Sequence, residues 1–219
     1  MIALDFGAVL SQWPMLARGL STTVVLTAVS ALLGGALGVV CAWAKTEGPV
    51  WARYLVGAYV EAIRNTPFIV QLFFLFFGLP SLGIRLSPEA ASVLAMVINL
   101  GAYAAEIVRA GVQATPRGQV EAALSLALSR SQVFLRVVLP PALSRVWPAL
   151  TSQIVIVMLG SAVCSQIAAE ELSYYANLIH SRNFRAFEAY IVVTLLYLVL
   201  AVGLRQLLRW CGPRFLFGR

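Results

Sequence analysis

Few side chains in this sequence could perform covalent chemistry, and they are poorly arranged for it. A phosphate-binding loop for ATP needs Gly-Lys followed by Ser or Thr, but the only lysine, Lys45, follows Ala44. The three cysteines have unrelated spacings, which favour neither a disulfide framework nor a zinc site. No nucleophile stands beside a base, and the only histidine, His180, has no metal-binding neighbours at a suitable spacing. We therefore expect no catalytic residue, no bound metal or cofactor, and no ATP hydrolysis on this chain.

Polar residues interrupt three apolar runs at a similar depth. If the runs are helices, Asn65 lies about 16 Å from Tyr54, and Asn99 lies about 16 Å from the outer end of its run. In a later run Ser161 lies about 20 Å from Trp147. Polar groups inside a membrane span are costly and usually functional. They indicate a substrate site or gate at mid-depth, although hydrogen bonds between helices and a proline kink would give the same pattern.

The clearest interruption is the segment Arg64-Asn65-Thr66-Pro67. Pro67 has no N–H, so the carbonyl of Ile63 loses its helical donor. Irregular backbone is tolerated inside a membrane only where protein or a water-filled cavity surrounds it.

Charged residues within the apolar runs occur in pairs. Glu61 and Arg64 are three residues apart, and so are Glu106 and Arg109. Because this spacing places two side chains on one helix face, we expect a structural ion pair in both cases.

Composition places these residues in a membrane protein. The chain of 219 residues has a mean hydropathy of +0.86 and 11% charged residues, against roughly 25% in soluble domains. Apolar stretches of about 20 residues, enough to cross a bilayer, recur along it. We predict an all-α integral membrane protein, a single transmembrane domain over residues 1–219 with five spans. The predicted spans are Leu20–Ala44, Tyr54–Phe77, Pro88–Val108, Trp147–Ala169 and Ala189–Leu208. In the first span Gly34, Gly35 and Gly38 suit close helix packing, within the bundle or against another subunit.

The distribution of Lys and Arg predicts the orientation. With the N-terminus outside and the C-terminus inside, eleven of these residues face the cytoplasm and four face outward, as the positive-inside rule requires. The eleven are Lys45, Arg53, Arg109, Arg117, Arg130, Arg136, Arg145, Arg205, Arg209, Arg214 and Arg219; the four are Arg18, Arg85, Arg182 and Arg185. Because the arginines lie in the gaps between apolar runs, the net charge of +7 does not indicate nucleic acid binding. Glu170, Glu171 and Glu188 then lie in an outer loop, which we expect to be solvated or to contact an external partner.

Between the third and fourth spans lies a basic, amphipathic cytoplasmic insert, residues 115–141. Thr115 followed by Pro116 has the form of a helix start, and Ser129-x-x-Gln132 has the form of a capping box. The proline pair 140–141 is expected to end the second helix. Two short amphipathic helices with a bend between them would lie on the membrane surface or dock in a groove of another protein. The pattern alone leaves both open.

The insert also carries a recognisable motif. Glu121-Ala122-Ala123, then three residues, Ala127, nine residues and Val137-x-Leu139-Pro140 resembles the EAA loop of permease subunits of bacterial ABC importers. The stretches "YVEAIRNTPFIVQLFFLFFGLP" and "AEIVRAGVQATPRGQVEAA" resemble the polar amino-acid branch, whose members carry histidine, glutamine, arginine or glutamate. The likeness covers nearly the whole chain.

The resemblance implies that the insert docks on a separate ATPase subunit and couples it to the membrane helices. The residues that match the coupling motif are Glu121, Ala122, Ala123, Ala127, Leu139 and Pro140. Ala127 departs from the family's Gly, and a left-handed backbone there would cost roughly 1–2 kcal/mol.

The resemblance also implies the partners and the location. They are two ATPase subunits that hold ATP and Mg²⁺, a second permease subunit (identical or homologous), and a periplasmic or lipid-anchored substrate-binding protein, in the bacterial cytoplasmic membrane. The chain itself would be a transport subunit that performs no catalysis. The alternative is a membrane-anchored scaffold protein whose insert lies on lipid.

For the substrate path, the resemblance implies that Asn65, Thr66 and Pro67 face the translocation route. A family segment reading Lys-Asp-Thr-Ser aligns with Leu159-Gly160-Ser161-Ala162, so only Ser161 is retained as a contact. The full set of predicted path residues is Asn65, Thr66, Pro67, Asn99, Gln153, Ser161 and Gln166.

Overall fold

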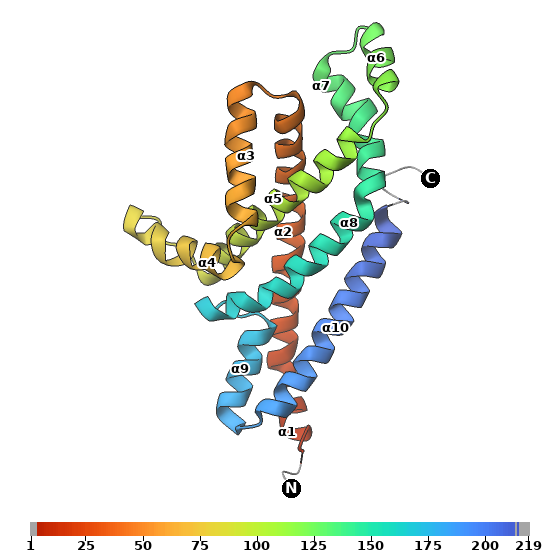
Figure 1. Cartoon of the computed structure of the whole chain (residues 1–219). Coiled ribbons are helices and arrows are strands. Elements are labelled where there is room, and N and C mark those ends of the chain that lie inside the picture. The colour runs from red at the N-terminus through yellow and green to blue at the C-terminus, as the bar shows by residue number, and fades with distance from the viewer. Residues whose placement is uncertain (1–3, 213, 215–219) are drawn as a thin grey trace.

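A computed structural model describes residues 4–212 and 214, and every regular element among them is a helix. Figure 1 shows an elongated molecule with a long central helix and a small helical extension at one end. The longer helices are α2 (Trp13–Glu47), α3 (Val50–Arg64), α5 (Pro88–Gln113), α8 (Leu139–Gly160), α9 (Leu172–Asn183) and α10 (Ala186–Cys211). The shorter elements are α1 (Gly7–Leu10), α4 (Phe68–Phe73), the π-helical turn η1 (Phe74–Gly78), the 3₁₀ turn η2 (Leu79–Leu82), α6 (Arg117–Ser125), α7 (Arg130–Val133), the π-helical turn η3 (Phe134–Val138) and the 3₁₀ turn η4 (Ser161–Ile167).

The described residues contain the expected number of membrane spans when one bent pair is counted as a span. Four helical stretches are long and apolar enough to cross a bilayer: Trp13–Glu47, Pro88–Gln113, Arg130–Ile167 and Ala186–Cys211. The fifth consists of Val50–Arg64 and Phe68–Leu82, and the chain direction bends by 111° between these two pieces. The sequence indicated broken backbone at Pro67, but the chain turns much more sharply than a proline kink, and α4 leaves the body sideways (Figure 1).

Glycines on α2 let α5 approach it closely. A Cβ added at Gly34 would lie 2.9 Å from the Leu100 side chain, and one at Gly38 would lie 2.4 Å from Ala104. Both neighbours belong to α5, so these two glycines serve packing within the bundle, one of the two interpretations left open by the sequence. Gly35 has nothing within 4 Å of such an atom.

The second helix of the insert continues into the membrane. α7 passes through η3 directly into α8, so the prediction that the prolines at 140–141 end this helix is wrong. Pro140 and Pro141 fall in the first turn of α8, where a missing N–H removes no bond of that helix. π-helical turns such as η3 are rare and occur mostly as single turns inside α-helices, as here.

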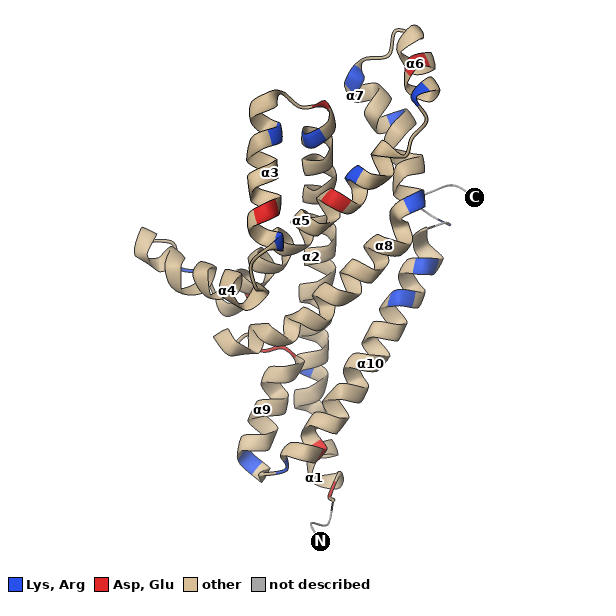
Figure 2. Ribbon diagram, in the orientation of Figure 1, with Lys and Arg blue, Asp and Glu red and all other residues tan. Residues whose placement is uncertain are grey.

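Basic residues gather at the end of the molecule that carries α6 and α7, and fewer lie near α1 and α9 (Figure 2). This is the separation on which the predicted orientation rests, although Arg219 lies outside the described residues. Orientation itself remains a prediction.

At the opposite end, the expectation of a solvated loop is wrong at two positions, because Glu188 is 3% exposed and Glu171 is completely buried. The Glu171 Oε1 accepts a hydrogen bond from the Tyr174 N–H at the start of α9, and its Oε2 accepts one from the Tyr197 hydroxyl of α10. Burial raises the pKa of Glu171 above its ordinary value of 4.5. Glu170, in contrast, is exposed and accepts a hydrogen bond from the Tyr175 hydroxyl at 2.8 Å.

Candidate translocation path and coupling loop

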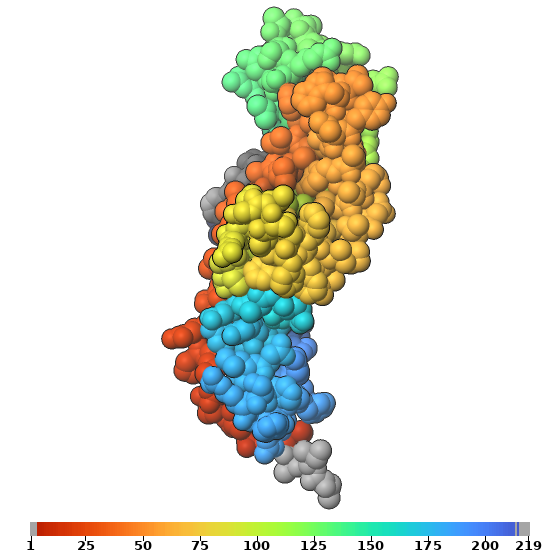
Figure 3. Space-filling model, turned by 90° about the vertical axis from the view of Figure 1, so that its left-hand side faces the viewer, coloured from red at the N-terminus to blue at the C-terminus, as the bar shows by residue number. Residues whose placement is uncertain are grey.

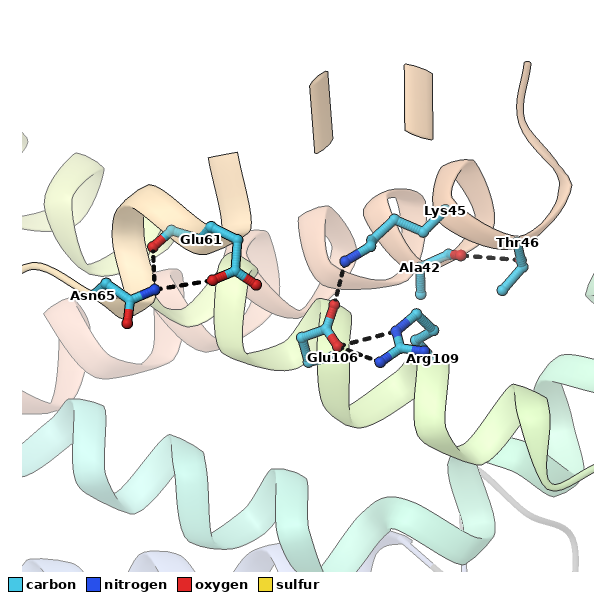
Figure 4. Close-up of polar contacts among 7 residues, drawn as sticks. All are labelled: Ala42, Lys45, Thr46, Glu61, Asn65, Glu106 and Arg109. Carbon is cyan, nitrogen blue, oxygen red and sulfur yellow. Dashed lines mark hydrogen bonds and ion pairs between the residues drawn. The ribbon is translucent and has the colours of Figure 1, made fainter. Parts of the chain in front are cut away.

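The break between α3 and α4 presents its polar residues on the surface of the subunit. Asn65, Thr66 and Pro67 are all exposed. The Asn65 Nδ2 donates to the Glu61 carbonyl at 2.8 Å and to its carboxylate at 3.0 Å (Figure 4). The Thr66 hydroxyl donates to the Ala62 carbonyl at 2.8 Å. Two carbonyls at the end of α3 therefore have partners from the break itself.

Gln71, which the sequence analysis did not single out, holds the break together. Its Nε2 lies 2.8 Å from the carbonyl oxygen of Ile63, the group that Pro67 deprives of a donor, and 2.9 Å from the Thr66 hydroxyl. The Nδ2 of Asn99 on α5 donates to the Gln71 Oε1 at 3.0 Å. The sequence feature that could have identified Gln71 is a glutamine four residues after a proline within an apolar run.

Glu61 and Arg64 do not form the expected ion pair in the described structure. Glu61 instead accepts the hydrogen bond from Asn65, and the Arg64 guanidinium lies over the Tyr103 ring, 5.6 Å from its centroid. Both side chains are exposed on the isolated subunit. Because charged residues within a membrane span rarely face hydrocarbon, we expect this surface to adjoin protein or water.

The remaining path residues lie on α8 and η4. Ser161 is buried and donates its hydroxyl to the Met158 carbonyl at 2.6 Å, whereas Gln166 is exposed and Gln153 is half-buried. η4 packs against α4, and Figure 3 shows the segments of α3, α4, α8 and α9 following one another down one face. Within the described residues, Gln71 is hydrogen-bonded both to Thr66 of the break and to Asn99, but no hydrogen bond connects this group to Gln153. The roles of these residues in transport remain predictions.

An ion cluster links α2 to α5 just before the insert. The Lys45 Nζ donates to the Glu106 Oε1 at 2.6 Å, and Arg109 donates to the Oε2 through Nε at 3.0 Å and Nη2 at 2.6 Å (Figure 4). The predicted pair of Glu106 and Arg109 is thus confirmed, and Lys45 joins it from another helix. Because the cluster is only partly exposed, it fixes the ends of α2 and α5 that lie nearest the insert relative to each other.

In the insert, Glu121 and Ala122 are exposed, whereas Ala123 is buried against Val133 and Val138. α6 thus packs on the second helix of the insert through Ala123, and the exposed Glu121 lines the space beside this contact. A hollow of about 300 Å³ lies between the two helices and the end of α5. Leu139 packs with the residues of α5 and α8, and Pro140 is exposed.

The bend after α6 has a left-handed residue. Ala127 has φ +60°. Its N–H donates to the Leu124 carbonyl at 3.0 Å, and the Leu128 N–H donates to the Ala123 carbonyl at 3.4 Å. This pair of bonds is a Schellman motif, in which Gly is the usual residue at the left-handed position.

The two predicted helix starts differ in outcome. Ser129 forms the expected capping box, accepting from the Gln132 N–H while the Gln132 side chain accepts from the Ser129 N–H. Thr115 is not the N-cap: Pro116 occupies that position, and the buried Thr115 hydroxyl has no partner among the described residues. The chain reaches α6 through an extended Pro116, which carries the threonine one residue too early to cap the helix.

Comparison with known proteins covers almost the whole chain. The family profile described as "Binding-protein-dependent transport system inner membrane component" matches residues 34–217. The L-cystine transport system permease protein TcyB of Bacillus subtilis (strain 168) is 34% identical over 91% of this chain and 89% of its own length. The glutamine transport system permease protein GlnP of Escherichia coli (strain K12) is 34% identical over 94% of each chain.

A solved structure agrees with the sequence relatives. The crystal structure of an amino acid ABC transporter with histidines has a chain that is 33% identical, with a TM-score of 0.86 over 98% of this chain and 100% of that one. The function is therefore that of a non-catalytic permease subunit of an ABC importer, whose ATPase is a separate subunit, and the scaffold interpretation is not favoured. The chain belongs to the family of binding-protein-dependent transport system inner membrane components.

Proposed function

We propose that this chain forms the translocation path for a polar amino acid or a close relative. The complex would contain two permease subunits, two ATPase subunits that hold ATP and Mg²⁺, and an external substrate-binding protein, in the bacterial cytoplasmic membrane with the N-terminus outside. The observation that carries the substrate class is the similarity, over 98% of the chain, to an amino acid ABC transporter. The two relatives above are named for cystine and glutamine transport.

The exposed face of the break supports a path completed by a second permease. Glu61 offers a carboxylate and Arg64 a guanidinium, with Asn65 and Thr66 next to them, all exposed on the isolated subunit. Opposite charges on one helix turn match the ammonium and carboxylate groups that every amino acid carries. α4 and η1 add an apolar rim, including Phe74 (74% exposed) and Phe77 (63% exposed), suited to contact with the other subunit.

The insert supports coupling to the ATPases. Glu121 is exposed on α6, and α7 continues through η3 into α8 without a gap. A push on the insert would therefore move α8 directly. In the proposed cycle, ATP binding closes the ATPases and draws the two inserts together, which opens the path outward; hydrolysis returns it inward.

The test is purification of the native complex in mild detergent, followed by ATP-driven uptake of labelled amino acids after reconstitution into liposomes. We expect an ATPase to co-purify and at least one polar amino acid to accumulate. A chain that purifies without an ATPase would refute the coupling. Transport of some other solute class by an intact complex would refute only the substrate assignment.

A further inference from the structure

One buried amide connects the break in the second span to the helix that leads into the insert. Gln71 is 9% exposed. Its Nε2 lies within hydrogen-bonding distance of the Ile63 carbonyl (2.8 Å), the Thr66 carbonyl (3.1 Å) and the Thr66 hydroxyl (2.9 Å). Its two N–H groups are thus shared among three acceptors on the far side of the break.

The acceptor side of the same amide faces α5. The Asn99 Nδ2 donates to the Gln71 Oε1 at 3.0 Å. One residue away, the Tyr59 hydroxyl of α3 donates to the Ile98 carbonyl at 2.6 Å. α5 therefore holds α3 directly through Tyr59 and α4 through Gln71, on either side of the bend.

The hydrogen bonds that Gln71 donates satisfy backbone groups that have no partner within their own helix. The Ile63 carbonyl cannot receive a bond from Pro67, which has no N–H. Because Gln71 is buried, water has little access to the inner side of the break, and a backbone carbonyl there that loses its donor stays unsatisfied at a cost in free energy. Among the described residues, Gln71 supplies the donor for Ile63.

We propose that Gln71 is the positioning residue of the translocation path. Its amide fixes the 111° bend between α3 and the segment Phe68–Leu82, and thereby the placement of Asn65 and Thr66, and it transmits movement of α5 to the bend through Asn99. Because α5 leads directly into the insert, this bond connects the coupling loop to the break along α5, separately from the connection through α8. The expected effect of Gln71 on transport rests on the proposed function, whereas its expected effect on the angle of the bend does not.

Two isosteric variants separate the two sides of the amide. Gln71→Met removes the donors and the acceptor. Gln71→Glu keeps an acceptor for Asn99, but at most one O–H donor, when protonated, remains for the three acceptors on Ile63 and Thr66. Asn99→Leu breaks only the link to α5. Gln206→Met, at an exposed position of α10, is the matched control for a glutamine lost from a membrane helix.

The geometric measurement uses spin labels at Tyr54 (77% exposed) and Leu82 (75% exposed), which lie on the two arms of the bend. In the labelled complex the partly exposed Cys211 is replaced by Ser. Pulsed electron resonance then gives the distribution of distances between the arms. We expect Gln71→Met and Gln71→Glu to broaden or shift this distribution and Gln206→Met to leave it unchanged. If both Gln71 variants insert, assemble with the ATPase and retain the original distribution, the proposal is overturned.

The transport measurement uses the same complexes in liposomes. We expect the Gln71 variants to raise KM for uptake about tenfold, corresponding to about 1.4 kcal/mol, and Asn99→Leu to lower the number of substrate molecules moved per ATP with a smaller change in KM. A purely structural role would lower the amount of assembled complex and leave KM and the coupling ratio of the remainder unaltered. If the wild-type complex moves no amino acid, the proposed function fails while the distance measurement still decides the role of Gln71.

Discussion

Replacing Ala127 by Gly should strengthen the bend of the insert. Ala127 has φ +60°, a left-handed conformation that costs an L-residue with a Cβ roughly 1–2 kcal/mol. Glycine removes this cost but loses more backbone entropy on folding, by roughly 0.5–1 kcal/mol. The net expected gain is about 0.5–1 kcal/mol in the local free energy of opening of α6 and the bend.

Hydrogen exchange followed by mass spectrometry measures this directly. The Ala127 and Leu128 amides close the bend by bonding to the Leu124 and Ala123 carbonyls, so peptides covering the bend should exchange about two- to fivefold more slowly in Ala127→Gly. Ala122→Gly, within α6 and exposed, is the matched control and should exchange faster because Gly costs about 1 kcal/mol in a helix interior. If Ala127→Gly also exchanges faster, the left-handed assignment and the strain argued from it are wrong.

Two further predictions concern charged residues. Glu106→Gln removes the carboxylate that pairs with Lys45 and Arg109 at 2.6 Å each and leaves two partly buried cations together. We expect a loss of about 2 kcal/mol in stability and a lower Tm in detergent. An unchanged Tm would show that the cluster does not hold α2 and α5 together. The folded pKa of Glu171 is raised above 4.5 by burial, so its contribution to stability is full below pH 4.5 and is lost as the pH rises through the raised value. Glu171→Gln, which keeps an acceptor for the Tyr174 N–H, should remove this decline from a series of Tm values against pH, and an identical decline in the variant would assign it to another group.

Local rules predicted the features of this chain that depend on short segments. The missing N–H of Pro67 predicted broken backbone, and the Ser129 capping box formed as its spacing required. The small residues Gly34 and Gly38 predicted a close helix contact, and the structure places it between α2 and α5. In each case the cause and its consequence lie within a few residues of the chain or along one helix face.

Features that depend on packing between distant segments could not be predicted in this way. The direction of α4 depends on Gln71 and Asn99, which meet only after α5 has packed against the break. Glu61 and Arg64 have a spacing that permits an ion pair, but Tyr103 and Asn65 compete for them. Glu171 is buried because Tyr197, from α10, reaches its carboxylate, a contact that spacing along the chain does not encode.

The central claim is that the insert, residues 115–141, couples an ATPase to a path through this chain. Its most direct test is ATP-driven amino-acid uptake by reconstituted complexes that carry Glu121→Lys, which reverses the charge at an exposed position of α6. We predict that the variant inserts in normal amounts and loses at least nine tenths of its ATP-driven uptake, together with its retention of the ATPase. Uptake equal to that of the unaltered complex, with the ATPase still bound, would contradict the account.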